Sequence, residues 1–174
     1  MRVTPVFVAL LMATSLSVQA DGQIADREGT RSSPLTLGLF GFAARAGIDF
    51  EDQGQAVASV ALDLGDLFTD RLRLRPSAEI GFGWGENTYV ANVEIIYRLA
   101  ADTYSVIPYI GGGIALAGQE GCGAIDSCPA IWGQFAIGAE LPFRDQMNWI
   151  IEYHGENEFR RHRLLFGLTT RRGN

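Results

Sequence analysis

The chain has 174 residues, a formal net charge of -6 and 47% hydrophobic residues. The negative charge argues against nucleic acid as a partner, because nucleic-acid-binding domains carry excess basic residues to neutralise phosphates. All fourteen basic residues are arginine, whose planar guanidinium suits ion pairing in a crowded interior.

The first twenty residues have the three parts of a secretory signal. Arg2 supplies a positive charge, residues 6–13 (VFVALLMA) form a short apolar run, and Ala20 ends the segment at a position that signal peptidase inspects. The run is shorter than the ~20 apolar residues that a membrane-spanning helix needs. We therefore predict a signal peptide over 1–20 rather than an anchor, followed by a flexible polar lead over 21–34.

After the lead, the chain divides into eight segments separated by turn residues. Most of these segments alternate polar and apolar side chains with period two, which is typical of β-strands. No stretch of the mature chain approaches the ~18 continuous apolar residues of a transmembrane helix. The predicted strands lie at 35–49, 55–65, 71–84, 88–99, 104–117, 131–141, 147–154 and 159–170.

The alternation gives each strand one polar and one apolar face. It is clearest over 71–82, 133–141 and 149–154. Such strands fit a soluble sandwich or lipocalin-like barrel with its apolar faces inward, or a membrane barrel with those faces outward to lipid. In the second case the lipid-facing residues are Leu72, Leu74, Ile80, Phe82, Phe135, Ile137, Trp149 and Ile151.

Two features favour the membrane barrel. The connectors alternate, and the longest, 118–130, falls in the group that faces outside when both chain ends are periplasmic. Aromatic residues also gather near the segment ends, as in the aromatic girdles of outer-membrane barrels. We therefore expect an all-β fold, an eight-stranded antiparallel up-and-down transmembrane β-barrel over 35–170. The aromatic residues concerned are Phe68, Trp84, Tyr89, Tyr97, Tyr104, Trp132, Phe143, Trp149 and Tyr153.

Outward apolar faces imply that the charged faces meet inside the barrel. The lumen of an eight-stranded barrel is narrow enough for side chains to fill it. Buried charges must be paired, so a nearly balanced set predicts a plugged, structural lumen rather than an ion path or a catalytic carboxylate pair. The predicted inward charges are Arg45, Asp63, Arg73, Arg75, Glu79, Glu94, Arg98, Glu140, Glu152, Arg161 and Arg163.

The two cysteines, Cys122 and Cys128, lie in the longest connector beside Gly121, Gly123 and Pro129. A closely spaced pair in an exported protein predicts a disulfide. Nothing nearby completes a four-ligand zinc set, so no metal site or cofactor is expected there.

The only histidines, His154 and His162, flank the last predicted hairpin. A four-residue connection over 155–158 would place His154 opposite Phe159 and Glu152 opposite Arg161. The same register puts Arg160 and His162 on the outer face near the rim, where they could contact lipid phosphates. His154 is then an ordinary rim residue.

The stretch Leu72–Gly83 (LRLRPSAEIGFG), followed by Tyr109-Ile110-Gly111-Gly112-Gly113, resembles a known class of exported proteins. With the signal and the eight alternating segments, it is similar to the small eight-stranded outer-membrane barrels, the class of the OmpA membrane domain and OmpX. The resemblance spans residues 35–170 and implies insertion by the barrel-assembly machinery among outer-membrane lipid and lipopolysaccharide. Members commonly end on an aromatic residue, whereas this chain has a polar tail over 171–174.

Lipid A deacylases are also eight-stranded barrels, with a histidine and a serine close together on one strand. In this chain Glu156 stands two places after His154, and no serine follows Ser127. We therefore assign no catalytic residue. The expected function is a structural or surface-interacting outer-membrane barrel without catalysis. The alternatives are a lipid-modifying enzyme of the deacylase kind and a soluble periplasmic barrel that binds a small apolar ligand.

Overall fold

A computed structural model describes residues 35–50, 54–83, 86–100, 105–122 and 128–171. The predicted signal peptide, the lead and the last three residues of the tail lie outside these ranges. Among the described residues, no helix is long and apolar enough to cross a membrane.

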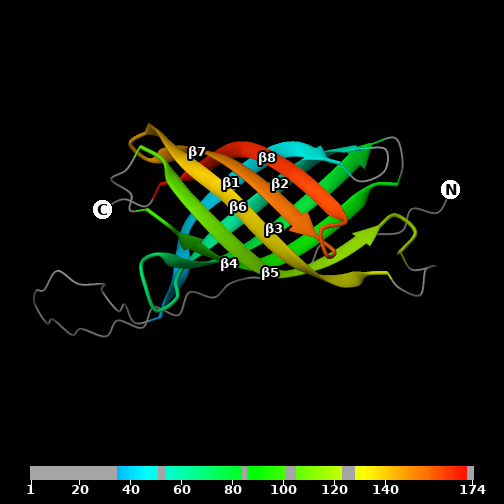
Figure 1. Ribbon diagram of the computed structural model, residues 1–174, viewed down its shortest axis with the longest axis horizontal. Coiled ribbons are helices and arrows are strands. Elements are labelled where there is room, and N and C mark those ends of the chain that lie inside the picture. The colour runs from blue at the N-terminus through cyan, green and yellow to red at the C-terminus, as the bar shows by residue number, and fades with distance from the viewer. Residues whose placement is uncertain (1–34, 51–53, 84–85, 101–104, 123–127, 172–174) are drawn as a thin grey trace, which may run out of the picture.

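The described chain forms eight strands that close into one antiparallel barrel (Figure 1). Each strand pairs with its sequence neighbours, and β8 pairs with β1 to complete the ring. This closure confirms the predicted fold class and leaves no second sheet of a sandwich among the described strands. The strands are β1 Thr36–Asp49, β2 Gln55–Asp66, β3 Leu72–Gly83, β4 Thr88–Arg98, β5 Ile107–Gln119, β6 Ala130–Arg144, β7 Met147–Glu156 and β8 Arg161–Thr170.

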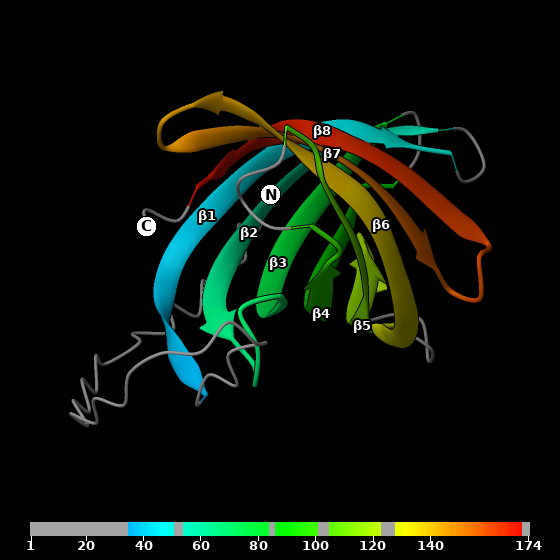
Figure 2. The same ribbon diagram turned by 60° about the vertical axis from the view of Figure 1, so that its left-hand side comes forward.

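Alternate residues of each strand point into the barrel or away from it, and the polarity is inverted relative to a soluble protein. The inner faces carry buried arginines and glutamates, whereas the outer faces carry exposed large apolar side chains. Ile80, Ile137 and Ile151, for example, are 51%, 47% and 44% exposed. The strands are tilted and curve around a common axis (Figure 2). All eight residues predicted to face lipid lie on this outer side, with Leu72, Leu74 and Trp149 half-buried among their neighbours.

Two predicted girdle residues, Trp84 and Tyr104, lie outside the described ranges, and among the described ones Trp132 points into the barrel. Trp132 shares its face of β6 with the inward residue Gln134 and packs inside the barrel against Val90, Ala115 and Ala117. The expectation that Trp132 belongs to an outer girdle is wrong, because strand alternation places it on the lumen side.

The strands extend further than the sequence predicts at two glycines. Gly118 and Gly155 were expected in connectors, yet each pairs within a strand, with Tyr89 and His162 respectively. A Cβ at Gly118 would lie 2.3 Å from the ring of Tyr89, and one at Gly155 would lie 2.6 Å from the ring of Phe159. These glycines therefore accommodate aromatic rings that cover the strand rather than marking turns.

The predicted register of the last hairpin is also wrong, and the reason is again a strand that continues past a glycine. Because β7 continues through Gly155, the connection is 157–160, and Asn157, Glu158 and Phe159 adopt left-handed conformations there. Glu152 then pairs with Leu165, His154 with Arg163, and Glu156 with Arg161.

Candidate functional site in the barrel lumen

Strand β7 contributes three successive inward side chains, Glu152, His154 and Glu156, which have no exposed surface. They project into the lumen because they alternate with Tyr153 and Gly155 on the other face. Their placement corrects the expectation that His154 is an ordinary rim residue, since the ring is enclosed among charged groups.

Glu152 is the most heavily bonded of the three. Its Oε1 accepts from the Arg45 guanidinium and contacts the imidazole of His154, while Arg75 Nη2 donates to its Oε2 at 2.5 Å. The Tyr109 hydroxyl donates to the same Oε2. Charge-assisted bonds from several strands hold this carboxylate in one position.

Glu79 is the second carboxylate on which several charged groups converge. Its Oε2 accepts from Arg163 Nη1 at 2.6 Å, and its Oε1 lies 3.5 Å from His154 Nδ1 and 3.6 Å from Arg45 Nη2. His154 is therefore enclosed between two carboxylates, those of Glu79 and Glu152.

A further layer closes the cluster toward the turn. Arg161 Nε and Arg163 Nε donate to the same Asp49 oxygen at 2.5 and 2.9 Å, and Arg163 Nη1 also reaches Glu156 Oε1 at 3.3 Å. Breaking one partner of such a buried pair is strongly destabilising, because the remaining charge is left without compensation.

All eleven predicted lumen residues lie on the inner side, but the structure divides them. Arg45, Arg75, Glu79, Glu94, Glu152 and Arg163 share the central cluster, and Arg161 lies in the layer above it. Two pairs lie apart: Arg98 with Glu140 at 3.7 Å, and Arg73 with Asp63 at 3.5 Å.

Sequence reasoning missed four members of the central network: Asp49, Tyr109, His154 and Glu156. Asp49 lies four residues after Arg45, and Glu156 four after Glu152, so strand alternation extended through the strand ends would have included both. No sequence signal marks Tyr109, because it sits in an otherwise apolar and glycine-rich strand.

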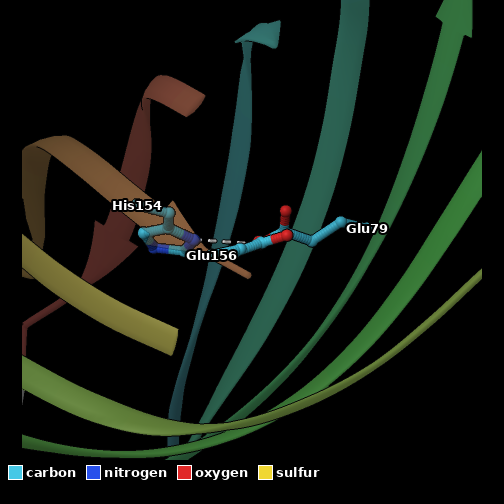
Figure 3. A group of neighbouring side chains, drawn as sticks. All are labelled: Glu79, His154 and Glu156. Atoms are coloured by element: carbon cyan, nitrogen blue, oxygen red, sulfur yellow. Dashed lines mark ion pairs between the residues drawn. The ribbon is translucent and has the colours of Figure 1, made fainter. Parts of the chain in front are cut away.

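Two groups of three side chains in this cluster bring potential metal ligands together. Glu79, His154 and Glu156 form one group, and Glu94, Glu152 and His154 form the other, with ligand atoms within 4.8 Å in each. Figure 3 shows the first group, in which the imidazole from β7 points toward the carboxylate from β3. Both groups use the same histidine.

A cavity of about 460 Å³ opens at the mouth of the barrel beside this cluster. Thr88, Gln119, Trp132 and Arg161 line it together with the disulfide residue Cys128. Arg161 donates to Thr88 Oγ1 at 3.0 Å and lies 5.9 Å from the centre of the Trp132 ring.

The remaining predicted site residues lie at the same end of the barrel. Cys122 and Cys128 form the predicted disulfide, with Cα atoms 5.0 Å apart. Arg160 is exposed in the 157–160 turn, and His162 lies on the outer face with its Nδ1 2.7 Å from the Tyr153 hydroxyl.

The fold and the lumen define a class: a small, closed, eight-stranded up-and-down barrel with an apolar outer surface and a charged interior. No protein-family model matches the sequence, and no curated protein is significantly similar to it.

Solved structures share this fold. The N-terminal β-barrel domain of Pseudomonas aeruginosa OprF has a TM-score of 0.54 and 13% identity, covering 76% of this chain and 98% of that one. Neisserial surface protein A has a TM-score of 0.54 and 12% identity, covering 75% and 94%. The outer membrane enzyme PagL has a TM-score of 0.49 and 17% identity, covering 74% and 97%. At these identities the first two similarities establish the fold alone, which confirms the resemblance drawn from the sequence at that level.

Proposed function

We propose that this chain is a barrel of the bacterial outer membrane with a structural or surface-interacting role and no catalysis. The observation that carries the proposal is the inverted polarity: charged residues are buried in a paired network, while large apolar side chains cover the outside. Lipid is the environment in which such an outer surface is stable.

The aromatic residues support two membrane boundaries. Near one end of the barrel, Trp149 lies between Phe143 and Phe166, with ring centres 4.9 Å apart in both pairs. Near the other end, Phe135 contacts Phe159 at 6.0 Å. Rings at the two ends of an apolar band match the interfacial girdles of membrane barrels.

The charged network supports a plugged lumen. Ion pairs join β1, β3 and β7 through Arg45, Arg75 and Glu152, and they fill the middle of the barrel. A lumen filled in this way favours a structural role over conduction.

The outer rim supports a contact with lipopolysaccharide phosphates. Arg160 is exposed in the turn, and His162 on the adjoining outer face is already oriented by Tyr153. A guanidinium binds phosphate through two parallel hydrogen bonds. Replacing Arg160 with Gln is expected to reduce lipopolysaccharide co-purification, whereas Arg71→Gln, at the opposite end of the barrel, is the matched control. Equal retention by both variants contradicts this contact.

Fractionation tests the main proposal. The protein is expected in the outer membrane and to migrate differently on gels before and after heating, because a closed barrel resists detergent until heated. Recovery in the soluble periplasmic fraction contradicts the proposal. An unchanged lipid A mass spectrum on expression is expected for a barrel without lipid-modifying activity, and a shifted spectrum contradicts that part.

A further inference from the structure

The group shown in Figure 3 has the composition of a metal site. His154, Glu79 and Glu156 supply one imidazole and two carboxylates, with ligand atoms within 4.8 Å of one another. Nitrogen and carboxylate donors without thiolate suit divalent transition metals such as Zn²⁺. All three side chains are buried, so an ion among them would be shielded from bulk water.

The imidazole is oriented as in known metal sites. One ring nitrogen, Nε2, is bonded to the Glu152 carboxylate, which leaves Nδ1 facing Glu79 Oε1 at 3.5 Å. Metal-binding histidines donate their other N–H to a carboxylate in this way. Two ligands of a tetrahedral ion with bonds of about 2.0–2.1 Å lie roughly 3.3 Å apart, close to this separation.

Two buried oxygen atoms beside the group have no hydrogen-bond partner within the part of the chain that the structure describes. They are Glu156 Oε2 and Gln134 Oε1. Arg163 bonds the other oxygen of Glu156, so Oε2 is the atom left for a ligand. Gln134 pairs directly with Glu156 across the strands, and its amide lies 3.2 Å from His154 Nδ1. Rotating that amide by half a turn would present Oε1 to the same point.

Charge balance also favours a cation. The described inner side chains in the ion-pair network include eight carboxylates but six guanidiniums. A divalent ion would neutralise this set with His154 uncharged. The carboxylates are Asp49, Asp63, Asp66, Glu79, Glu94, Glu140, Glu152 and Glu156, and the guanidiniums are Arg45, Arg73, Arg75, Arg98, Arg161 and Arg163.

The mouth cavity approaches the group from the β7–β8 end of the barrel. Arg161, which lines the cavity, is the direct strand partner of Glu156. Trp132, also in its lining, precedes Gln134 by two residues on the same face of β6. The cavity therefore ends one layer of side chains from the group.

We propose that the lumen binds one divalent transition metal ion of the Zn²⁺ class through His154 Nδ1, Glu79 and Glu156. Glu152 acts as a positioning residue that fixes the imidazole. This site goes beyond the proposed membrane role, because the barrel closes through its backbone pairing whether or not an ion is bound. The competing arrangement is a doubly protonated His154 that bridges Glu79 and Glu152.

The first experiment uses the unaltered protein. Mature barrel is purified in detergent, stripped with a chelator and titrated with Zn²⁺ alone, followed by calorimetry and by ¹⁵N NMR of the two histidines. The expected result is one Zn²⁺ per chain and a large shift of the His154 Nδ1 resonance, assigned with the His162→Gln variant. A His154 ring protonated at both nitrogens and unmoved by Zn²⁺, or the absence of saturable micromolar binding, overturns the proposal.

Variants locate the ion. Glu156→Gln keeps the shape of the side chain and is expected to weaken Zn²⁺ binding at least tenfold. Glu140→Gln, a lumen residue paired elsewhere with Arg98, is expected to leave the affinity unchanged. Heat-dependent gel migration verifies that each variant is folded. Equal affinity in the two variants overturns the assignment, and the measurement on the unaltered protein stands if Glu156→Gln does not fold.

Discussion

Arg75 on β3 donates to Glu152 on β7 at 2.5 Å, which joins two strands that lie four places apart around the eight-stranded ring. Because no backbone pairing connects these strands, the side-chain bond is a strut across the lumen. Arg45 from β1 reaches the other oxygen of the same carboxylate, and Tyr109 from β5 donates to the same oxygen as Arg75, so side chains of four strands meet at Glu152.

This strut predicts a large cost for removing one partner. Glu152→Gln is expected to lower the free energy of unfolding by ~3–5 kcal/mol, because the buried guanidiniums of Arg45 and Arg75 lose their nearest carboxylate. The carboxylates that remain, Glu79 at 3.6 Å from Arg45 and Glu94 at 3.3 Å from Arg75, lie farther away. Urea unfolding followed by gel migration measures the loss. In a double-mutant cycle with Arg75→Gln, the two losses are expected to be strongly non-additive. Glu140→Gln combined with Arg75→Gln is the control, and its two losses of unfolding free energy should be nearly additive. Additive losses for Glu152→Gln and Arg75→Gln would show that these two side chains do not interact.

The apolar outer surface predicts that a charge is costly on the strands but tolerated outside them. Ile137 is 47% exposed on the outer face of β6, and an arginine there is expected to cost ~2–4 kcal/mol in a bilayer. Glu86→Arg, at an exposed position outside the strands, should have little effect. Folding equilibria in lipid vesicles measure both, and a neutral Ile137→Arg would place that face in water.

The packing around Gly138 predicts that this position tolerates no side chain larger than hydrogen. A Cβ there would lie 2.5 Å from the Tyr109 ring and 2.7 Å from the Ile151 carbonyl oxygen, so Gly138→Ala is expected to destabilise the barrel by ~1–3 kcal/mol. Gly133, on the same strand, has no described atom within 4 Å of its Cβ position. Gly133→Ala is therefore the matched control, and equal unfolding midpoints for the two variants would show that the Tyr109 ring and the Ile151 carbonyl both shift without cost.

The disulfide predicts a thiol count. Alkylation of the denatured, unreduced protein should detect no free thiol from Cys122 or Cys128, and reduction should release two. The small ring is expected to contribute about 2 kcal/mol to stability on the chain-entropy estimate. Cys122→Ser/Cys128→Ser, which cannot close the ring, should unfold with the same midpoint in reducing and oxidising buffer.

Much of the fold follows from residue alternation. In β3 the inward set Arg73, Arg75 and Glu79 alternates with apolar residues, and that alternation alone specifies which side of the sheet each residue occupies. It also placed Trp149 outside correctly. The girdle prediction for Trp132 is wrong because it rests on residue type, whereas the alternation of Trp132 with Gln134 on β6 directs the side chain inward.

The strand ends were less accessible from sequence. Glycine is common in turns, so Gly155 is easily taken for one. In the structure the ring of Phe159 covers Gly155, and β7 stays paired with β8 as far as Glu156. That contact forms only after the hairpin closes, so no local pattern reports it. With β7 extended in this way, Glu156 lies on the lumen face and pairs with Arg161.

The sequence by itself therefore determined the all-β class, the number of strands, the inverted polarity and the cysteine pair, because these depend on local composition and a period of two. Only the tertiary structure decided which charges meet. Arg75 and Glu152 lie 77 residues apart, and His154 faces Glu79 from the other side of the ring. Such contacts depend on ring closure and on the register of every strand between them, and neither is encoded in any one segment.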